Sequence, residues 1–157
     1  MSGPQPSPSP QPSPTPGRTP ADIVVDFLGA WARYDVDAVL ELVTEDLVYT
    51  NVSLPTIHGR DRLERLARPI IRDDRLGFNA YLHHVATDGD VVLTDRVDEL
   101  HFRRFAARFW VYGRFVVRDE KIAVWRDSFD WLDVTIGNLR GLLGLVAPAL
   151  NRRPPED

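Results

Sequence analysis

Three short stretches of the sequence each place two functional side chains two residues apart. The pairs are Tyr49 with Asn51, Arg96 with Asp98, and Trp125 with Asp127. Successive side chains of a β-strand point to opposite faces, so the two members of each pair share a face. If the three strands curl so that these faces meet, two carboxylates, a guanidinium, a phenol and an amide converge at the floor of a pocket. Two such carboxylates could act as an acid and a base, while the arginine offsets their buried charge.

The alternative for Arg96 and Asp98 is a solvent-facing edge strand, because charged side chains are mostly exposed. Considered alone, the strand at 91–100 favours this alternative. The convergence of three strands favours the buried arrangement, although the pairing of strands cannot be read from the sequence. Asp130 and Glu99 rank second as acids, because alternation places them on the opposite faces from Asp127 and Asp98.

Helical patterns come first along the chain. Thr19, Pro20 and Asp22 have the residue types of a helix N-terminus, and apolar residues follow at helical spacing. A second, short helix begins near Asp35. The segment 60–75 is predicted to be a helix, or two half-helices broken at Pro69.

Strand patterns dominate from residue 77 onward. Strands are expected at 47–51, 78–86, 91–100, 107–117 and 122–129, and residues 53–59 are expected to form a loop. Helices followed by a curled sheet and a closing helix indicate an α+β fold. A strongly bent sheet wrapped around a helix leaves a pocket at its open end.

The closing helix carries a wide apolar face, made by Ile136, Leu139, Leu142, Leu143 and Val146. So wide a face is expected to be buried in a core, a lid or a subunit contact. Membrane-surface binding is a weaker alternative for this helix.

Composition sets the domain boundaries. Residues 1–18 are rich in proline and serine and are expected to be a disordered tail, which leaves a single domain at 19–151 and a flexible end at 152–157.

The net charge of −4 argues against nucleic-acid binding, and the absence of cysteine excludes disulfides and thiolate metal sites. No apolar run is long enough for stable membrane insertion, and no signal peptide is recognisable, so a cytoplasmic location is expected. His83 and His84 face opposite ways on a strand and cannot share a metal.

Several motifs together resemble the limonene-1,2-epoxide hydrolase family. They are Tyr49-Thr50-Asn51 with Leu54-Pro55, Arg96-Val97-Asp98, Val111-Tyr112-Gly113-Arg114-Phe115, and Trp125-Arg126-Asp127-Ser128-Phe129-Asp130. The segment 140–150 is similar to the mycobacterial members. The resemblance implies the cone-shaped α+β fold of the nuclear-transport-factor-2-like (NTF2-like) superfamily. The sequence departs from the family pattern at Asp95 and Ser128, where glutamate and tyrosine are usual.

The resemblance also implies roles for individual residues. Arg96, Asp98 and Asp127 match the family's Asp-Arg-Asp triad, and Tyr49 and Asn51 match its water-holding pair. Asp127 would then be the base and Asp98 the acid in a one-step hydration of an epoxide, with no metal or organic cofactor. One difficulty is that Arg96 should lower the pKa of the acid, which must be protonated to act.

The implied partners are a small lipophilic epoxide and, from the superfamily, a second copy of the chain in a homodimer that uses the outer face of the sheet. The expected substrate pocket is lined by Phe27, Trp31, Phe109, Val111 and Phe129. The sequence does not choose between terpene, fatty-acyl and sterol epoxides. Two other functions stay open: a ketosteroid-isomerase-like or cyclase-like enzyme on the same fold, and a non-catalytic binding module whose pocket would be blocked.

Overall fold

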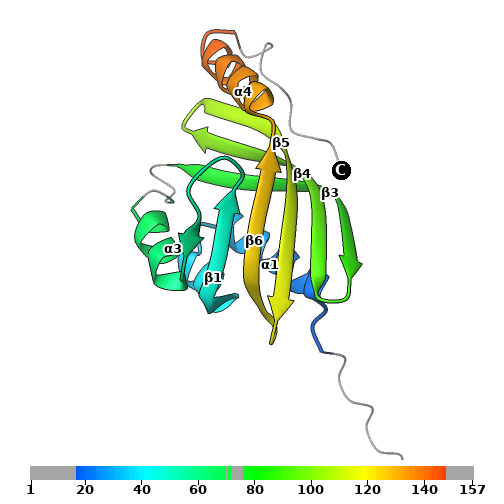
Figure 1. Cartoon of the computed structure of the whole chain (residues 1–157). Coiled ribbons are helices and arrows are strands. Elements are labelled where there is room, and N and C mark those ends of the chain that lie inside the picture. Colours follow the sequence, from blue (N-terminus) through cyan, green and yellow to red (C-terminus); the bar gives the residue numbers. More distant parts are fainter. Residues whose placement is uncertain (1–16, 70, 72–75, 148–157) are drawn as a thin grey trace, which may run out of the picture.

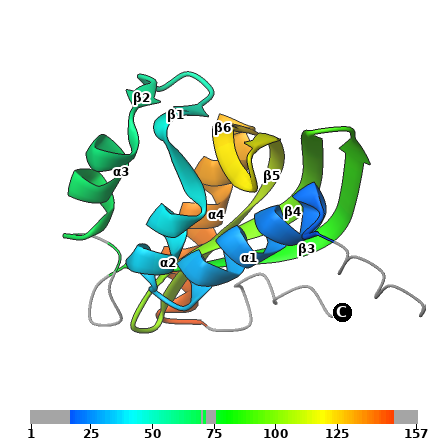
Figure 2. The same cartoon turned by 90° about the horizontal axis from the view of Figure 1, so that it is seen from below.

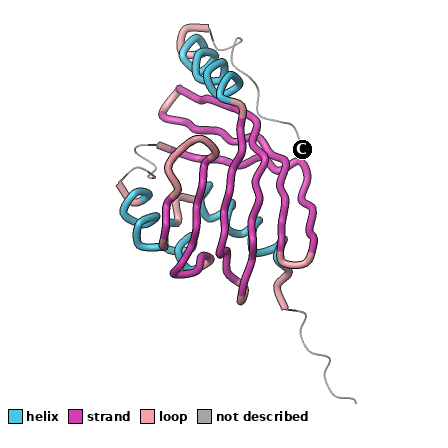
Figure 3. Tube along the Cα trace, viewed as in Figure 1, coloured by secondary structure: helices cyan, strands magenta, loops and turns pink. Residues whose placement is uncertain are grey.

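One curved sheet and the helices around it make up the described part of the chain, residues 17–69, 71 and 76–147 of a computed structural model (Figures 1 and 3). The strands are β1 (Val43–Asn51), β2 (Ile57–His58), β3 (Gly77–Asp88), β4 (Val91–Phe102), β5 (Phe105–Arg118) and β6 (Lys121–Phe129). The helices are α1 (Pro20–Ala32), α2 (Val36–Glu41), α3 (Arg60–Ala67) and α4 (Trp131–Gly144). The strand order is β2-β1-β6-β5-β4-β3, in which only the β1–β6 pair is parallel. The predicted α+β class with a curved, mixed sheet is confirmed.

Helix α1 begins where the sequence predicts. The Thr19 hydroxyl accepts a hydrogen bond from the Asp22 amide, and the Asp22 carboxylate accepts one from the Thr19 amide. This reciprocal capping box satisfies two amides that the first helical turn leaves unpaired. Pro20 occupies the first turn, where its missing N–H costs nothing.

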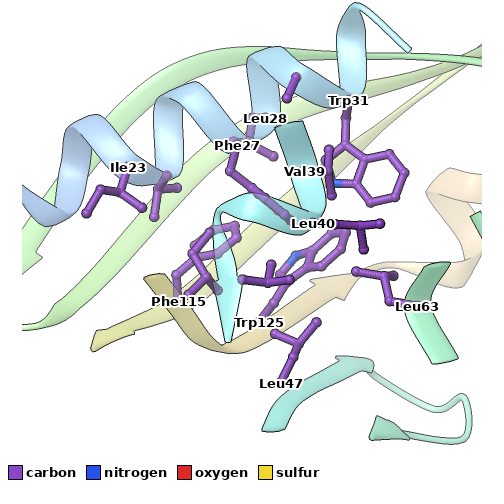
Figure 4. Close-up of a cluster of buried hydrophobic side chains, with 14 of the residues drawn as sticks. Ile23, Phe27, Leu28, Trp31, Val39, Leu40, Leu47, Leu63, Phe115 and Trp125 are labelled. Atoms are coloured by element: carbon purple, nitrogen blue, oxygen red, sulfur yellow. The ribbon is translucent and has the colours of Figure 1, made fainter. Parts of the chain in front are cut away.

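The core lies between α1, α2 and one face of the sheet (Figures 2 and 4). The Phe27 ring makes edge contacts with Trp125, at 5.0 Å between centroids, and with Phe115, at 6.2 Å. Figure 4 shows these rings with Leu28 and Trp31 filling the space over the sheet. Helix α1 therefore covers this face of the sheet over the core.

Most strand boundaries differ from the sequence-based expectations by one or two residues, and three differences are larger. β1 begins at Val43 rather than at residue 47, and the expected loop at 53–59 contains the two-residue strand β2, which pairs with β1. α3 ends at Ala67, ahead of Pro69, whose missing N–H cannot extend a helical hydrogen-bond ladder. Residues 70 and 72–75 of the predicted helix lie outside the described residues.

Helix α4 packs against β5 through its glycines. A Cβ atom added to Gly137 would lie 2.6 Å from the carbonyl oxygen of Arg108, and one added to Gly141 would lie 2.7 Å from that of Ala106. Only glycine allows the helix to approach the β5 backbone this closely. The apolar stripe consequently faces away from the sheet, with Leu139 55% and Leu142 56% exposed. Burial of this face in the core is therefore wrong, and the alternatives of a lid or a subunit contact stay predictions.

Within the described residues, no helix is both long and apolar enough to span a bilayer. The predicted tail lies almost wholly in residues 1–16 and the predicted flexible end in 152–157, which are outside the described residues. The domain boundaries and the cytoplasmic location therefore stay predictions.

Candidate active site

Arg96 lies at the centre of a buried ionic cluster. It is completely buried, and Asp98 and Asp127 are only 5% and 4% exposed. The Arg96 Nε donates to Asp98 Oδ1 at 2.7 Å, and its Nη2 donates to Asp98 Oδ2 at 3.1 Å. Nη2 also lies 2.9 Å from Asp127 Oδ2, so that one guanidinium bridges both carboxylates. The structure thus brings together the three charged side chains that the sequence singled out.

The order of the strands explains how Arg96 reaches both acids. Asp98 is on β4 and Asp127 is on β6, and β5 lies between these two strands. Arg96 pairs in register with Val111 of β5, and Asp127 pairs with Gly113. The long arginine side chain therefore crosses over β5 to contact the carboxylate on the far strand.

Tyr49 and Asn51 reach the same place because β1 runs parallel to β6. Tyr49 pairs in register with Trp125, and Asn51 pairs with Asp127. The Asn51 Nδ2 donates to the Tyr49 hydroxyl at 2.7 Å, and the Tyr49 ring stacks on Trp125 with 3.8 Å between centroids. Burial, reinforced by the charge of Asp127, raises the pKa of Tyr49 above its usual range. Tyr49 is therefore a neutral phenol that can donate or accept a hydrogen bond.

A cavity of about 370 Å³ opens over these groups. Four polar side chains face it: Tyr49, Asn51, Asp98 and Asp127. The remaining wall is apolar and comes from Trp31, Ile57, Leu63, Leu66, Ala67, Ile71, Phe78, Leu100, Phe109, Trp125, Phe129, Trp131 and Val134. The polar groups thus form one patch in an otherwise apolar chamber, the usual composition of a small-ligand site.

Two of the five residues expected to line the pocket lie elsewhere. Trp31, Phe109 and Phe129 line the cavity, whereas Phe27 and Val111 do not. Phe27 is fully buried among core aromatics, and Val111 is the register partner of Arg96 and is covered. Phe27 instead packs against Trp125 and Phe115, and Val111 lies beside Arg96 in the sheet.

Burial dominates the electrostatics of the two acids. It raises the pKa of Asp98 to about 6, even though the charge of Arg96 lowers it. Burial likewise raises the pKa of Asp127 against the opposing effect of Arg96. The cluster is electrically neutral when the two carboxylates share one proton beside the guanidinium, and burial favours that state. A carboxyl group of this pair can therefore be protonated, as a general acid must be, despite its cationic neighbour.

The two oxygens of Asp127 have different surroundings. Oδ2 lies against the Arg96 guanidinium, whereas Oδ1 is buried and accepts no hydrogen bond of good geometry from the described residues. The Trp125 indole nonetheless helps to lower the pKa of this carboxyl group. A buried acceptor without a hydrogen bond is costly unless a ligand or water supplies a donor. Oδ1 is therefore a suitable acceptor for a water molecule in the cavity.

The two acids that the sequence ranked second lie outside the cavity. Asp130 Oδ1 accepts from the Leu132 amide at 2.7 Å and caps helix α4. Glu99 is buried on the other face of β4, where it accepts from Asn79 Nδ2 at 3.1 Å. Their surroundings give both residues structural roles.

Residues 18–140 match the limonene-1,2-epoxide hydrolase catalytic domain. The chain belongs to the limonene-1,2-epoxide hydrolase family. It is 42% identical over 124 residues to epoxide hydrolase EphG of Mycobacterium tuberculosis (strain ATCC 25618 / H37Rv), in an alignment that covers 79% of this chain and 82% of the relative. It is also similar to the solved structure of an M. tuberculosis LEH-like epoxide hydrolase, with a TM-score of 0.81 and 39% identity over 86% of this chain and 95% of that one. The family resemblance seen in the motifs is confirmed.

More distant structures share only the fold with this member of the limonene-1,2-epoxide hydrolase family. An NTF2-like protein of unknown function from Cytophaga hutchinsonii matches with a TM-score of 0.61 and 15% identity, over 73% of this chain and 93% of that one. This neighbour supports the predicted NTF2-like architecture and carries no information about the reaction.

Sequence reasoning missed much of the apolar wall of this limonene-1,2-epoxide hydrolase family site. Leu63, Leu66 and Ala67 come from α3, and their spacing on one helical face was the available signal. Trp131 and Val134 come from the first turn of α4 and line part of the cavity. Nothing in their local sequence indicates that this turn lies beside the acids.

Proposed function

We propose that this protein is an epoxide hydrolase that adds water to a lipophilic epoxide and forms a vicinal diol. The observation that carries the proposal is the buried Asp98–Arg96–Asp127 cluster at the floor of an apolar cavity. Membership of the limonene-1,2-epoxide hydrolase family, and a relative that is named an epoxide hydrolase, support the same activity.

The proposed reaction takes one step. Tyr49 and Asn51 hold a water molecule against Asp127, which accepts a proton as the water oxygen attacks an epoxide carbon. The carbon–oxygen bond of the ring breaks in the same step, and Asp98 gives its proton to the departing oxygen. The acid and the base each contribute about 10²- to 10⁴-fold. Water is consumed, and the proton gained by Asp127 must return to Asp98 before the next turnover.

Arg96 supports this reaction through charge and geometry. Its guanidinium contacts both acids, so it holds their rotamers and offsets the single negative charge that the two acids carry between them throughout the step. The raised pKa of Asp98, about 6, keeps a fraction of this residue protonated near neutral pH.

The substrate class follows from the cavity wall. Outside the polar patch, the side chains around the 370 Å³ chamber are aliphatic or aromatic. A substrate there gains from burying apolar surface, at roughly 25 cal/mol per Å². We therefore propose a lipophilic epoxide; terpene, fatty-acyl and sterol epoxides are the classes to compare.

The test begins with diol formation from a panel of these three epoxide classes. For an epoxide that reacts, a single turnover in ¹⁸O-water should place the label in the diol and none in the protein, because no covalent intermediate forms. The label is measured by mass spectrometry of the diol and of peptides containing Asp98 and Asp127. Label in either aspartate would mean a covalent ester and would refute the one-step mechanism, whereas an inert panel would count against the activity.

The two alternative functions receive less support. A non-catalytic binding module is expected to have a blocked pocket, whereas the cavity over the acids is open. An isomerase-like proton shuttle needs one carboxylate base and a neutral donor pair for an oxyanion. Here the second acid is tied to Arg96 by two hydrogen bonds. Incubation with a Δ5-ketosteroid in place of an epoxide separates these two enzymes.

We also propose that the chain forms a homodimer. The outer face of the sheet exposes Leu93 and Tyr112, and α4 exposes Leu139 and Leu142. Exposed apolar surface of this kind commonly marks a protein contact. Light scattering after size exclusion should give about twice the chain mass of 17.8 kDa. The mass of a single chain at micromolar concentration would contradict the dimer.

A further inference from the structure

Thr94 and Gly113 lie beside Arg96 but take no part in the proposed proton transfers. Thr94 is almost fully buried, and its hydroxyl accepts a hydrogen bond from Arg96 Nη1 at 2.9 Å. Gly113 has no side chain at the point where the guanidinium crosses β5. A Cβ atom there would lie 2.3 Å from Arg96 Nη1 and 2.5 Å from the Thr94 hydroxyl oxygen. The guanidinium therefore occupies the space that any other residue at position 113 would fill.

These two residues and the proposed base form one row across three strands. Thr94 of β4 pairs in register with Gly113 of β5, and Gly113 pairs with Asp127 of β6. The guanidinium lies over the glycine, with Nη1 bonded to Thr94 at one end of the row and Nη2 against Asp127 at the other.

The hydrogen bond to Thr94 fixes the plane of the guanidinium. A guanidinium is planar and presents its donors in a rigid fork. Asp98 receives two donors of this fork, Nε and Nη2, and Thr94 receives Nη1. With Nη1 anchored, Nη2 must point across β5 toward Asp127. Without that anchor, Nη1 would be a buried charged donor lacking this partner, and the fork would tilt to find another.

We propose that Thr94 and Gly113 are positioning residues that hold the Arg96 guanidinium against Asp127 and thereby keep the base and the acid aligned. The catalytic consequence rests on the proposed epoxide hydrolysis, whereas the structural consequence does not. Neither residue lines the cavity, so substrate binding is not involved. Loss of the arrangement therefore affects the chemical step and leaves substrate affinity unchanged.

The loss should also change the pH dependence. The charge of Arg96 lowers the pKa of Asp127, although burial raises it more. A tilted guanidinium lowers it less, so Asp127 would hold its proton to a higher pH. The base must be deprotonated to act, and the acidic limb of the kcat–pH profile would therefore move to higher pH. A substitution that only weakened the fold would not move this limb.

The test compares Thr94→Val, which keeps the shape and removes the hydroxyl, with Thr94→Ser, which keeps the hydroxyl. For an epoxide that the wild type hydrolyses, Thr94→Val should lower kcat by about 10- to 100-fold with KM unchanged, as expected for a small misalignment of reacting groups. Its acidic limb should shift to higher pH, and Thr94→Ser should restore most of both properties. Gly113→Ala should reproduce the Thr94→Val result. Thr94→Ala removes the same acceptor and replaces Thr94→Val if that variant does not fold.

Thr50→Val is the matched control. Thr50 is a part-buried threonine on β1 whose hydroxyl contacts that of Thr56 at 3.0 Å, outside the cavity. The Thr50→Val variant should keep the wild-type kcat and the wild-type pH profile. Wild-type kcat and an unmoved acidic limb in Thr94→Val would overturn the inference.

A second readout needs no activity. In ¹⁵N-arginine NMR, the Nη protons of buried Arg96 should exchange slowly and give separate signals, assigned by their absence in Arg96→Met. In Thr94→Val these signals should merge or vanish as the guanidinium begins to rotate. Unchanged signals would refute the positioning role even if the protein hydrolysed no epoxide, while an inert wild type with altered signals would count only against the proposed function.

Discussion

Replacing Asp127 with asparagine should lower kcat for epoxide hydrolysis by about 10³- to 10⁴-fold, the upper part of the range for loss of a general base. An amide cannot take a proton from water at neutral pH. Asp98→Asn should have a comparable effect, because the epoxide oxygen would then leave without its proton. Both variants should fold, since asparagine has the shape of aspartate and its carbonyl oxygen can still accept from Arg96. Initial rates of diol formation and melting temperatures measured side by side are the required data.

Asp130→Asn is the matched control for these two variants. Asp130 is three residues from Asp127, but its carboxylate caps α4 outside the cavity. Asparagine is an equally good helix cap, so this variant should keep both its stability and its activity. A folded Asp127→Asn protein with wild-type kcat would remove Asp127 from the mechanism.

Replacing Arg96 with methionine should destabilise the protein by about 3–5 kcal/mol at neutral pH and abolish hydrolysis. Methionine fills much of the same volume, so the loss reflects charge more than packing. Asp98 and Asp127 would stay buried without the cation that lies within 3.1 Å of both. Urea unfolding at several pH values measures the change in the free energy of unfolding.

The destabilisation of Arg96→Met should shrink as the pH falls. Arg96 lowers the pKa of both acids in the folded protein, so its removal raises these values further above those of the unfolded chain. A raised folded-state pKa means that stability is lost as the pH rises through that value. The deficit should therefore be small near pH 4 and large above the pKa of Asp98, which is about 6 even with Arg96 present.

Arg118→Met is the control for that series. Arg118 pairs with Asp46 at 2.6 Å, but both side chains are more than half exposed. Exposed pairs contribute little to stability, so the free energy of unfolding should change little at any pH. If Arg96→Met showed the same deficit at pH 4 and pH 8, buried carboxylate charge could not be its cause.

Strand alternation predicted much of this site from the sequence. It placed Arg96 with Asp98, and Tyr49 with Asn51, on shared faces, and the structure has them so. It could not show that β5 separates the two acids or that β1 joins the sheet in parallel beside β6, because strand order depends on contacts between distant segments. The roles of acid and base came from the family resemblance and stay proposals.

The sequence also could not show how deeply a residue is buried or which element it packs against. Strand alternation gives the face of Val111 and helical spacing gives that of Phe27, but neither pattern shows whether the residue reaches the cavity. Helical periodicity likewise identified the leucine stripe of α4, but not the stripe that contacts the sheet. Gly137 and Gly141 contact β5 because a residue without a side chain lets the two backbones approach closely. This contact depends on how α4 and β5 pack together, which the sequence does not show.

Substrate preference in this family can change through the helices that supply part of the cavity wall. The proton-transfer groups all lie on strands, whereas four residues of the chamber wall, Leu63, Leu66, Trp131 and Val134, lie on α3 and α4. Part of the chamber wall is thus encoded by segments that carry none of the proton-transfer groups. Substitutions in α3 and in the first turn of α4 can change the shape of the chamber, so that it accepts wider or narrower epoxides. The acids on the strands, and with them the reaction, stay the same.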